Sequence, residues 1–457
     1  MMVPGFPAAG AAVLIFFSLL SCATHAHVYE EVDTGVSAAF YSEALSRMEK
    51  RNYIRLAYPK RNAVLFYLDR GMIKHYAGLW DESSQDLEQG EILIEAAFTK
   101  SISQELSTFL LNDNTRDYPG EDYEDLYINV FNSLNYYHQN NLEGALVEIR
   151  RVNEKLNLLA DKYERATNKV LASNADLGAQ ANGMEAVKFS NSALARYLGL
   201  LFYRANGDAD DARIDLEELY RAYELAPLVY DHRPPSSLEE ELSVPLGKAR
   251  LNILAFTGLS PAKEEVNILI PLPLPPPNDW TRLALPRMAD RPSAIQSVEV
   301  ILTPSPSGRN TPDPKQQFRL EILENMSNVA RETFKARYAL TVLKSTARTI
   351  TKTVTTAVSA QALREAARKN DSAGAAGFGA LVDIFGKVFT VLSEQADLRI
   401  SRYFPARALA GGINLDPGIY TIQVNYYGLQ GLIAADQQDN VLIQPDKLNL
   451  AEFVCLK

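Results

Sequence analysis

The spacing of apolar residues changes near residue 227, and this change constrains the fold more than any other feature of the chain. From residue 36 to residue 227, apolar side chains recur at helical spacing, with short interruptions of Gly, Asn and Asp. Beyond residue 227 the chain turns to alternating apolar and polar residues, a pattern typical of strands with one buried face. The sequence therefore predicts an α+β protein with a helical front half and a β-rich back half.

Three helix pairs in the front half share a spacing. In each pair a turn-forming residue (Gly78, Asn140 or Gly207) precedes a helix whose small or apolar residues form one amphipathic face. This spacing resembles the tetratricopeptide repeat, a helix–turn–helix unit whose stacked copies form a superhelix. We expect a degenerate tetratricopeptide-like superhelix, and the alternative is a helical bundle in which the small residues coincide by chance.

The strongest strand pattern of the back half follows the turn residues Pro417 and Gly418. Alternate residues from Tyr420 to Tyr426 are apolar or aromatic, which predicts a strand with one buried face. Together with strand patterns near residues 266–270, 298–302, 318–322 and 448–456, this predicts a β-sandwich-like domain. We also expect a short helix at residues 246–256 and a helical hairpin inserted at about residues 323–397.

The N-terminus contains an apolar run at residues 8–20 that ends in Leu19-Leu20-Ser21-Cys22. This is the pattern of a lipoprotein signal, in which Cys22 is acylated and the chain is cut before it. It predicts a signal peptide at residues 1–21, a lipidated Cys22 with a tether to residue 35, a helical domain at 36–257 and a β domain at 258–457. The first charged residue is Glu30, whereas signal peptides normally open with Lys or Arg. An ordinary secretory signal cut after Ala23 or Ala26, or a retained apolar N-terminus, are therefore the alternatives.

Composition argues against several classes of function. The net charge of −10 disfavours binding to nucleic acid, and loss of Cys22 to lipidation leaves Cys455 without a disulfide partner. The five histidines lack zinc-site spacing, and the chain has no phosphate-binding loop or nucleophile elbow. We therefore expect no catalytic residues, no cofactor and no metal.

Charged residues at the centre of the helical half are the candidates for binding a partner protein. Stacked helical repeats bury their apolar faces and present polar residues along a concave surface. The expected partner-binding residues are Glu121, Asp122, Glu124, Glu148, Arg150, Arg151 and Asn153.

Asp397 and Arg399 are expected to act in structure, where the helical hairpin leads into the strand before Phe404 and Pro405. Residues two apart point to the same side only in an extended chain. The two side chains can therefore cooperate only where the chain has left the helix.

Four segments in a fixed order also carry a family resemblance. They are residues 118–124, 145–153 and 258–265, and residues 396–399 followed by Phe404-Pro405. The set resembles a family of uncharacterised bacterial envelope lipoproteins with a tetratricopeptide-like front half and a β-rich back half, although Ile400 stands where an aromatic residue is usual.

The resemblance implies a location in the cell envelope and interaction through helical repeats, with no activity to carry over. We expect an outer-membrane lipoprotein that faces the periplasm and serves as a protein-interaction scaffold. The resemblance marks Pro261, Lys263, Asp397 and Arg399 as a structural motif. The expected partner is another envelope protein. The alternative is a ligand-binding accessory lipoprotein of an envelope transport system.

Overall fold

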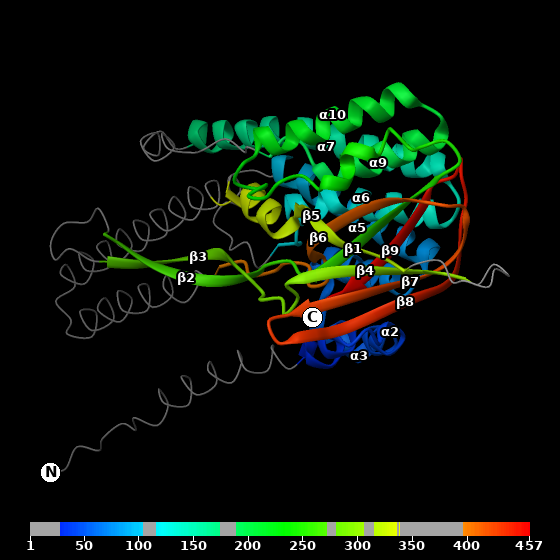
Figure 1. Cartoon of the computed structure of the whole chain (residues 1–457). Coiled ribbons are helices and arrows are strands. Elements are labelled where there is room, and N and C mark those ends of the chain that lie inside the picture. Colours follow the sequence, from blue (N-terminus) through cyan, green and yellow to red (C-terminus); the bar gives the residue numbers. More distant parts are fainter. Residues whose placement is uncertain are drawn as a thin grey trace, which may run out of the picture.

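The computed structural model describes residues 28–103, 116–173, 189–271, 280–305, 315–335, 338 and 396–457. Helices fill the front half and strands the back half, so the predicted α+β class is confirmed (Figure 1). The helices are residues 28–37, α2 (Tyr41–Met48), α3 (Arg51–Ala57), α4 (Ala63–Tyr76), α5 (Trp80–Ser103), α6 (Asp122–His138), α7 (Leu142–Ser173), α9 (Ala193–Asn206) and α10 (Ala209–Leu225), with short 3-10 turns η1 (Lys60–Asn62) and η5 (Ser236–Glu240). The strands are β1 (Ala249–Leu259), β2 (Ala262–Pro271), β3 (Trp280–Ala289), β4 (Ser297–Pro304), β5 (Gln316–Asn325), β6 (Pro405–Leu415), β7 (Gly418–Gly428), β8 (Gly431–Ile443) and β9 (Asn449–Cys455).

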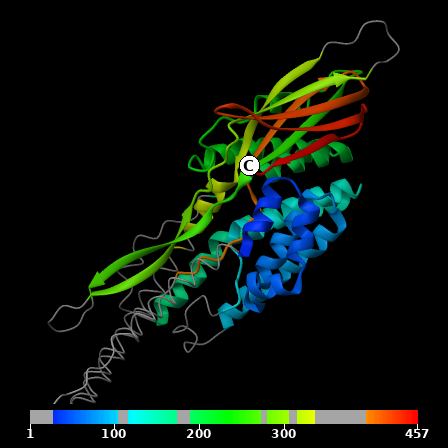
Figure 2. The ribbon, with the colours of Figure 1, turned by 90° about the horizontal axis from the view of Figure 1, so that it is seen from below.

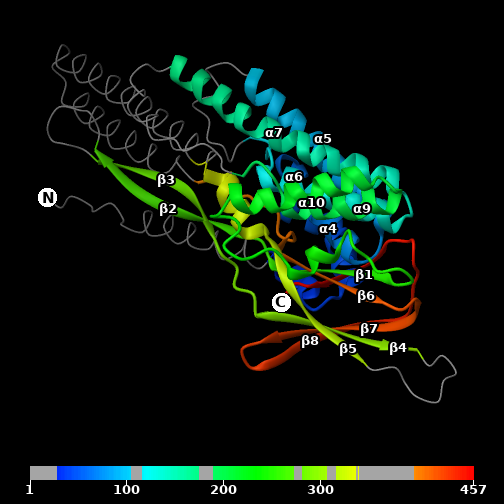
Figure 3. The ribbon, with the colours of Figure 1, turned by 45° about the horizontal axis from the view of Figure 1, so that its top comes forward.

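The three predicted helix pairs are α4 with α5, α6 with α7, and α9 with α10 (Figure 3). Small residues stand where α4 and α5 approach most closely. A Cβ on Gly71 would lie 2.9 Å from Leu87, and a Cβ on Gly90 would lie 2.9 Å from Leu68. Glycine therefore lets these two helices pack closely.

Seven strands form one sheet in the order β8-β7-β4-β5-β6-β1-β9, which curls until it is nearly closed like a barrel. β9 pairs with β1 in parallel and every other pairing in this sheet is antiparallel. The prediction of a two-layered sandwich is therefore wrong, because β4 pairs with both β5 and β7 and so joins the strands into one sheet. The predicted final strand is confirmed as β9, at the edge beside β1.

β1 occupies the place where a short helix at residues 246–256 was predicted. Leu251, Ile253 and Ala255 enter the core inside the curled sheet, whereas Leu254 and Phe256 pack against the helices. A strand covered on both faces is apolar throughout, and its sequence does not differ from that of a buried helix. The strands therefore begin at Ala249, before the predicted boundary at residue 258.

β2 and β3 pair with each other and form a two-stranded ribbon that projects from the body (Figures 1 and 2). Residues 272–279 of the proline-rich segment after β2 lie outside the described residues. Of the predicted helical hairpin, residues 323–325 belong to β5 and residues 326–335 are helical. Residue 338 is helical and residues 396–397 are not, whereas residues 336–337 and 339–395 lie outside the described residues.

The helices and the sheet share one hydrophobic core. The ring of Phe131 in α6 lies 5.0 Å from that of Phe256 in β1 and 6.0 Å from that of Phe404, between ring centroids. Leu450 of β9 and Leu456 belong to the same core as the helices α4, α6 and α9. The front and back halves are therefore packed together as one body.

Candidate functional site

The predicted anchor, Cys22, lies outside the described residues. The helix at residues 28–37 is folded against the body, so the predicted tether from 22 to 35 is wrong from Val28 onward. No helix among the described residues is both long and apolar enough to cross a membrane.

The start of α6 is built around Glu124, one of the predicted binding residues. Gly120 adopts a φ of 74°, which turns the chain into the helix, and Glu121 and Glu124 form a capping box at its N-terminus. The carboxylate of Glu124 accepts hydrogen bonds from the backbone N–H of Glu121 (2.7 Å), the hydroxyl of Tyr118 (2.8 Å) and the backbone N–H of Ser401 (2.5 Å). Glu124 therefore ties the helix to a segment almost at the other end of the chain.

Lys263 and the Asp397–Arg399 pair complete this arrangement, which we call the polar junction: Glu121, Glu124, Lys263, Asp397, Arg399 and Ser401. The Nζ of Lys263 contacts the carboxylate of Glu121 and donates to the carbonyl of Arg399 at 3.0 Å. Arg399 holds both carboxylate oxygens of Asp397, each at 2.8 Å. Three of the four structural-motif residues thus meet in space, and the fourth, Pro261, lies just before β2.

Two buried carboxylates, Asp69 beside the polar junction and Glu124 within it, accept hydrogen bonds from neutral donors. Asp69 of α4 accepts from the hydroxyls of Tyr58 (2.8 Å) and Ser401 (2.7 Å) and from the backbone N–H of Arg402 (2.7 Å). Burial raises the pKa of Asp69 to about 6, although these hydrogen bonds oppose the shift. Burial, reinforced by the charge of Glu121, likewise raises the pKa of Glu124 to about 7.

Glu324 of β5 is a third buried carboxylate of the same kind. The hydroxyls of Tyr230 (2.6 Å), Tyr127 (2.7 Å) and Ser192 (3.0 Å) all donate to it, and burial raises its pKa. Its donors come from α6, the N-terminal cap of α9 and the loop after α10. Because every oxygen of these three carboxylates has a donor, their arrangement fits a structural role that joins the helices to the sheet.

The predicted partner-binding residues do not form one exposed surface. Glu121, Asp122, Glu124 and Glu148 are at most 4% exposed. Glu148 accepts from Asn129 and pairs with Arg151, which also binds Glu91, so these side chains tie α5, α6 and α7 together. The expectation that the whole set lines an open groove is therefore wrong, because the carboxylates are used to join helices.

Arg150 is the member of the predicted set that is exposed, and Asn153 is half-buried. The guanidinium of Arg150 lies 5.8 Å from the ring centroid of Tyr203 in α9, and its Nε donates to the Tyr203 hydroxyl at 3.2 Å. Val147 on α7 and Ile214 on α10 are 44% and 45% exposed. The outer face of α7, α9 and α10 therefore presents a cation and an aromatic ring together with apolar side chains.

Two histidines and Glu452 of β9 form a further contact between the helices and the sheet. Nε2 of His75 lies 2.7 Å from one carboxylate oxygen of Glu452, and Nε2 of His138 lies 2.9 Å from the other. Trp80 stacks on the His138 ring at 4.1 Å. Burial alone would raise the pKa of Glu452, but the charges and hydrogen bonds of the two histidines lower it well below its ordinary value.

The proton positions around His75 follow from its neighbours. The Ser83 hydroxyl donates to the Gly71 carbonyl, so it accepts from the amide nitrogen of Asn135. The amide oxygen of Asn135 then faces Nδ1 of His75 at 2.7 Å, and Nδ1 must donate. His75 is therefore held with its Nδ1 protonated and its Nε2 directed at Glu452.

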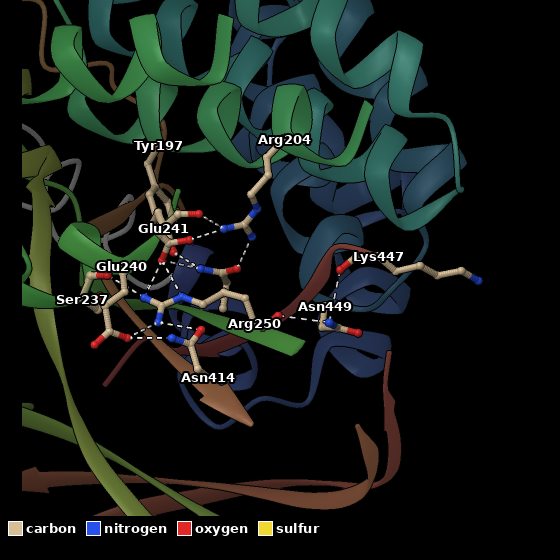
Figure 4. Close-up of polar contacts among 10 residues, drawn as sticks. Tyr197, Arg204, Ser237, Glu240, Glu241, Arg250, Asn414, Lys447 and Asn449 are labelled. Atoms are coloured by element: carbon tan, nitrogen blue, oxygen red, sulfur yellow. Dashed lines mark hydrogen bonds and ion pairs between the residues drawn. The ribbon is translucent and has the colours of Figure 1, made fainter. Parts of the chain in front are cut away.

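Figure 4 shows Arg204 of α9, Glu241 after η5 and Arg250 of β1 in a further buried ion-pair network. We call these three residues and Asn252 of β1, which bonds to Arg204 and Glu241, the clasp. Glu241 is fully buried and binds Arg204 at 2.6 Å and Arg250 at 3.0 Å. Asn252 donates to Glu241 at 2.8 Å and accepts from Arg204 at 2.8 Å. The clasp fixes α9 against the sheet.

The described part of the chain also has an open hollow of about 420 Å³ between α2, α4 and α5. Its lining is mostly polar or charged: Ser42, Leu45, Ser46, Glu49, Lys50, Lys74, Leu79 and Glu82. Among the described residues, no group of His, Cys, Asp and Glu side chains is arranged to hold a metal ion.

Sequence reasoning selected every residue of the polar junction except Ser401, and it missed Asp69, Glu324 and the pairing of Glu452 with His75 and His138. The partners in these contacts come from distant parts of the chain, as the 377 positions between His75 and Glu452 illustrate. A single charged residue in an otherwise apolar strand, such as Glu452 in β9, is the local signal of such a partner, whereas Asp69 lies in α4 beside Arg70 and gives no such signal.

Comparison of the chain with protein-family models, with curated proteins and with solved structures found no match. The arguments about function therefore rest on the sequence and on the geometry described above.

Proposed function

We propose that this protein is a bacterial cell-envelope lipoprotein, anchored to the outer membrane through Cys22 and facing the periplasm. The observation that carries the proposal is the lipoprotein pattern Leu19-Leu20-Ser21-Cys22 placed directly ahead of a folded body that begins at Val28. Stable attachment to the membrane requires further acyl chains, because a single acyl chain holds a protein there only marginally. On this proposal the body stands at the membrane without crossing it.

The test of the anchor is the variant Cys22→Ala. The variant should leave the membrane fraction after a high-salt wash, whereas the wild-type protein should remain, and mass spectrometry should find the acylated Cys22 only in the wild type. A Cys22→Ala protein that stays in the washed membranes, or an unmodified Cys22 in the wild type, would contradict the proposal.

We further propose that the body is a scaffold that binds another envelope protein through its tetratricopeptide-like helices. The support is the exposed outer face of α7, α9 and α10, where Arg150 and Tyr203 lie together and Val147 and Ile214 are open to solvent. Arginine and tyrosine are enriched among residues that dominate protein interfaces. On this proposal the partner binds the outer face of these helices and not the buried carboxylates.

The test of this surface is charge reversal at Arg150. Arg150→Glu should reduce cross-linked capture of the partner from intact envelopes and leave the unfolding midpoint unchanged, because Arg150 is exposed. Arg287→Glu is the matched control, since Arg287 lies exposed on β3, outside these helices, and pairs with the exposed Glu264 of β2. Equal capture by wild type and Arg150→Glu would exclude this surface.

A ligand-binding accessory of an envelope transport system is the second candidate. The hollow between α2, α4 and α5 has the volume of a small-molecule site. Its lining carries four charged side chains and only two leucines, however, whereas small-molecule sites are lined mainly by apolar side chains. This lining favours the scaffold over the accessory.

A further inference from the structure

The N-terminal chain enters the folded body beside the end of α3. The hydroxyl of Tyr29, the second residue of the first helix, donates to the carbonyl of Ala57 at 2.7 Å. The rings of Tyr29 and Tyr58 also meet edge to face at 5.9 Å. The residues that follow Cys22 must therefore reach the body at the C-terminal end of α3.

Five exposed cations lie on α3 and its flanking residues, and we call them the basic face: Lys50, Arg51, Arg55, Lys60 and Arg61. Within α3, Arg51 and Arg55 lie one turn apart, on the side opposite the buried Tyr53 and Ala57. Leu56, which is 55% exposed, lies beside them. A chain with a net charge of −10 thus gathers five cations within residues 50–61.

These five cations have no anionic partner among the described residues, because the nearby acids are occupied elsewhere. Glu31 pairs with Arg47 at 2.6 Å, Asp33 pairs with Arg402, and Glu49 lies 3.9 Å from Arg70. No ion pair or side-chain hydrogen bond joins the basic face to another part of the described chain. Within the described part of the chain, no carboxylate neutralises the positive charge of this face.

The length of chain between Cys22 and the body limits how far the body can lie from the membrane. Six residue steps separate Cys22 from Val28, and an extended chain covers at most about 3.3–3.6 Å per residue, so the body begins within about 20 Å of an acylated Cys22. A seven-residue helix is only about 10 Å long. If Cys22 is acylated as proposed, the C-terminal end of α3, which Tyr29 contacts, therefore lies within reach of the membrane surface that holds the acyl chains.

We propose that the basic face binds the headgroups of anionic phospholipids in the membrane to which Cys22 is attached. This inference rests on the proposed anchor and adds the orientation of the body, with α3 toward the lipid and the outer face of α7, α9 and α10 left for a partner. Clustered lysine and arginine residues next to an acyl anchor supply the second signal that stable attachment requires. Leu56 is placed to enter the interfacial layer between them.

The test uses the mature chain from Ala23, which carries no signal peptide and no acyl group and retains every described residue. Co-sedimentation should show binding to vesicles of phosphatidylglycerol with phosphatidylcholine and much weaker binding to phosphatidylcholine alone. Arg55→Gln combined with Lys60→Gln should weaken binding to the anionic vesicles by on the order of tenfold to thirtyfold. Salt should weaken binding of the unsubstituted chain in the same experiment.

The matched control is Arg213→Gln combined with Arg221→Gln, which removes the same charge from exposed positions on α10. This control should bind as the unsubstituted chain does, and both double variants should keep its unfolding midpoint. Equal binding by the two double variants, equal binding to both kinds of vesicle, or no binding by the unsubstituted chain would overturn the inference.

Failure of the anchor is distinguished by mass spectrometry of the protein from cells. An unmodified Cys22 together with charge-dependent vesicle binding would contradict the proposed anchor. The basic face would then still be a site that binds the membrane surface. An acylated Cys22, together with vesicle binding that is unchanged by the substitutions in the basic face, would support the anchor and contradict this inference.

Discussion

Asp397 and Arg399 illustrate at the residue scale how a short extended segment is held in place. Two guanidinium nitrogens of Arg399 donate hydrogen bonds to the Asp397 carboxylate. The third donates to the carbonyl of Arg116 at 2.9 Å. Burial alone would raise the pKa of Asp397, but the hydrogen bonds and charge of Arg399 lower it. This geometry is what the predicted structural role requires, because the pair lies in the extended segment that leads to β6.

We expect Asp397→Asn to lower the free energy of unfolding at pH 7 by about 2 kcal/mol, the range of a hydrogen bond to a charged group. Because the pKa of Asp397 is lowered on folding, its contribution is present above the ordinary value of 3.8 and is lost as the pH falls. Urea unfolding at pH 7 measures the effect. The control Asp416→Asn removes an exposed pair with Lys248 and should cost at most about 1 kcal/mol. Equal losses in the two variants would contradict a structural role for the Asp397–Arg399 pair.

Glu124 should make the protein less stable as the pH rises. Its pKa is raised from 4.5 to about 7, so its contribution is fully present below pH 4.5 and is lost as the pH passes 7. At about 1.4 kcal/mol per pKa unit the loss is on the order of 3 kcal/mol. Glu124→Gln should therefore show a smaller difference in unfolding free energy between pH 5.5 and pH 8 than the wild type does.

Urea unfolding at the two pH values measures this difference. The control Glu239→Gln changes an exposed carboxylate and should retain the wild-type difference. Glu452, whose pKa is lowered, loses its contribution only below its ordinary value of 4.5 and so does not enter this window. A wild-type difference retained in Glu124→Gln would show that another group is responsible.

At the scale of the element, the clasp depends on a glycine in β6. A Cβ on Gly412 would lie 2.6 Å from a guanidinium nitrogen of Arg250 and 2.8 Å from a carboxylate oxygen of Glu241. Both groups are buried and fixed by other hydrogen bonds, so neither can yield without breaking one. Position 412 of β6 must therefore lack a side chain for α9 to pack against the sheet.

We expect Gly412→Ala to lower the free energy of unfolding by about 1–3 kcal/mol, as overpacking of a filled interior does. Gly418→Ala is the control, because the nearest atom to its Cβ would be 3.6 Å away. Thermal or urea unfolding compares the two variants. If Gly412→Ala is as stable as Gly418→Ala, the clasp is not the constraint on this position.

The strands that were predicted from the sequence are those with one buried face, because their apolar residues then alternate with polar ones. The alternation at Tyr420–Tyr426 predicted β7 because this strand has one face inside the curled sheet. β6 and β8 gave no such signal: β6 carries Gly411 and Gly412 beside alanines, and β8 is polar and exposed along most of its length. β1 was predicted as a helix because both of its faces are covered.

The candidate site was predictable in its residues and not in its geometry. Glu121, Glu124, Lys263, Asp397 and Arg399 were all selected from sequence, but the charged carboxylates were expected at a surface. Their burial depends on donors such as Tyr118 and the backbone N–H of Ser401, which reach Glu124 only through tertiary contacts. Periodicity along one helix carries no information about such donors, and so it cannot distinguish a binding face from a buried junction.

At the scale of the whole molecule, the shared core and the contacts of Glu452 make the helical and β halves dependent on each other. Trp80 stacks on His138, which binds Glu452 of β9, so its indole ring is sensitive to contact between the halves. In the background Trp280→Phe, Trp80 is the only tryptophan. We expect its fluorescence and the far-ultraviolet circular dichroism to report one coincident transition in urea.

Glu452→Gln in the same background should move both transitions to lower urea together, because removing one member of a buried ion pair destabilises by about 3–5 kcal/mol. The control Glu299→Gln changes a half-buried carboxylate on β4 that contacts the hydroxyl of Tyr427 within the sheet, and it should leave a much smaller shift. A Trp80 transition that separates from the circular dichroism would show that the helices unfold independently of the sheet.

The dependence of the helical core on β9 also determines when the chain can fold. Phe404, Leu450 and Leu456 complete the core that α4, α6 and α9 begin, so the helical segment lacks part of its interior until these three residues have been synthesised. Contacts of such long sequence separation form late and slowly, because loop closure must precede them. If the chain is exported as proposed, this dependence of the helical core on β9 would keep the helical half from completing its fold before β9 is available to it.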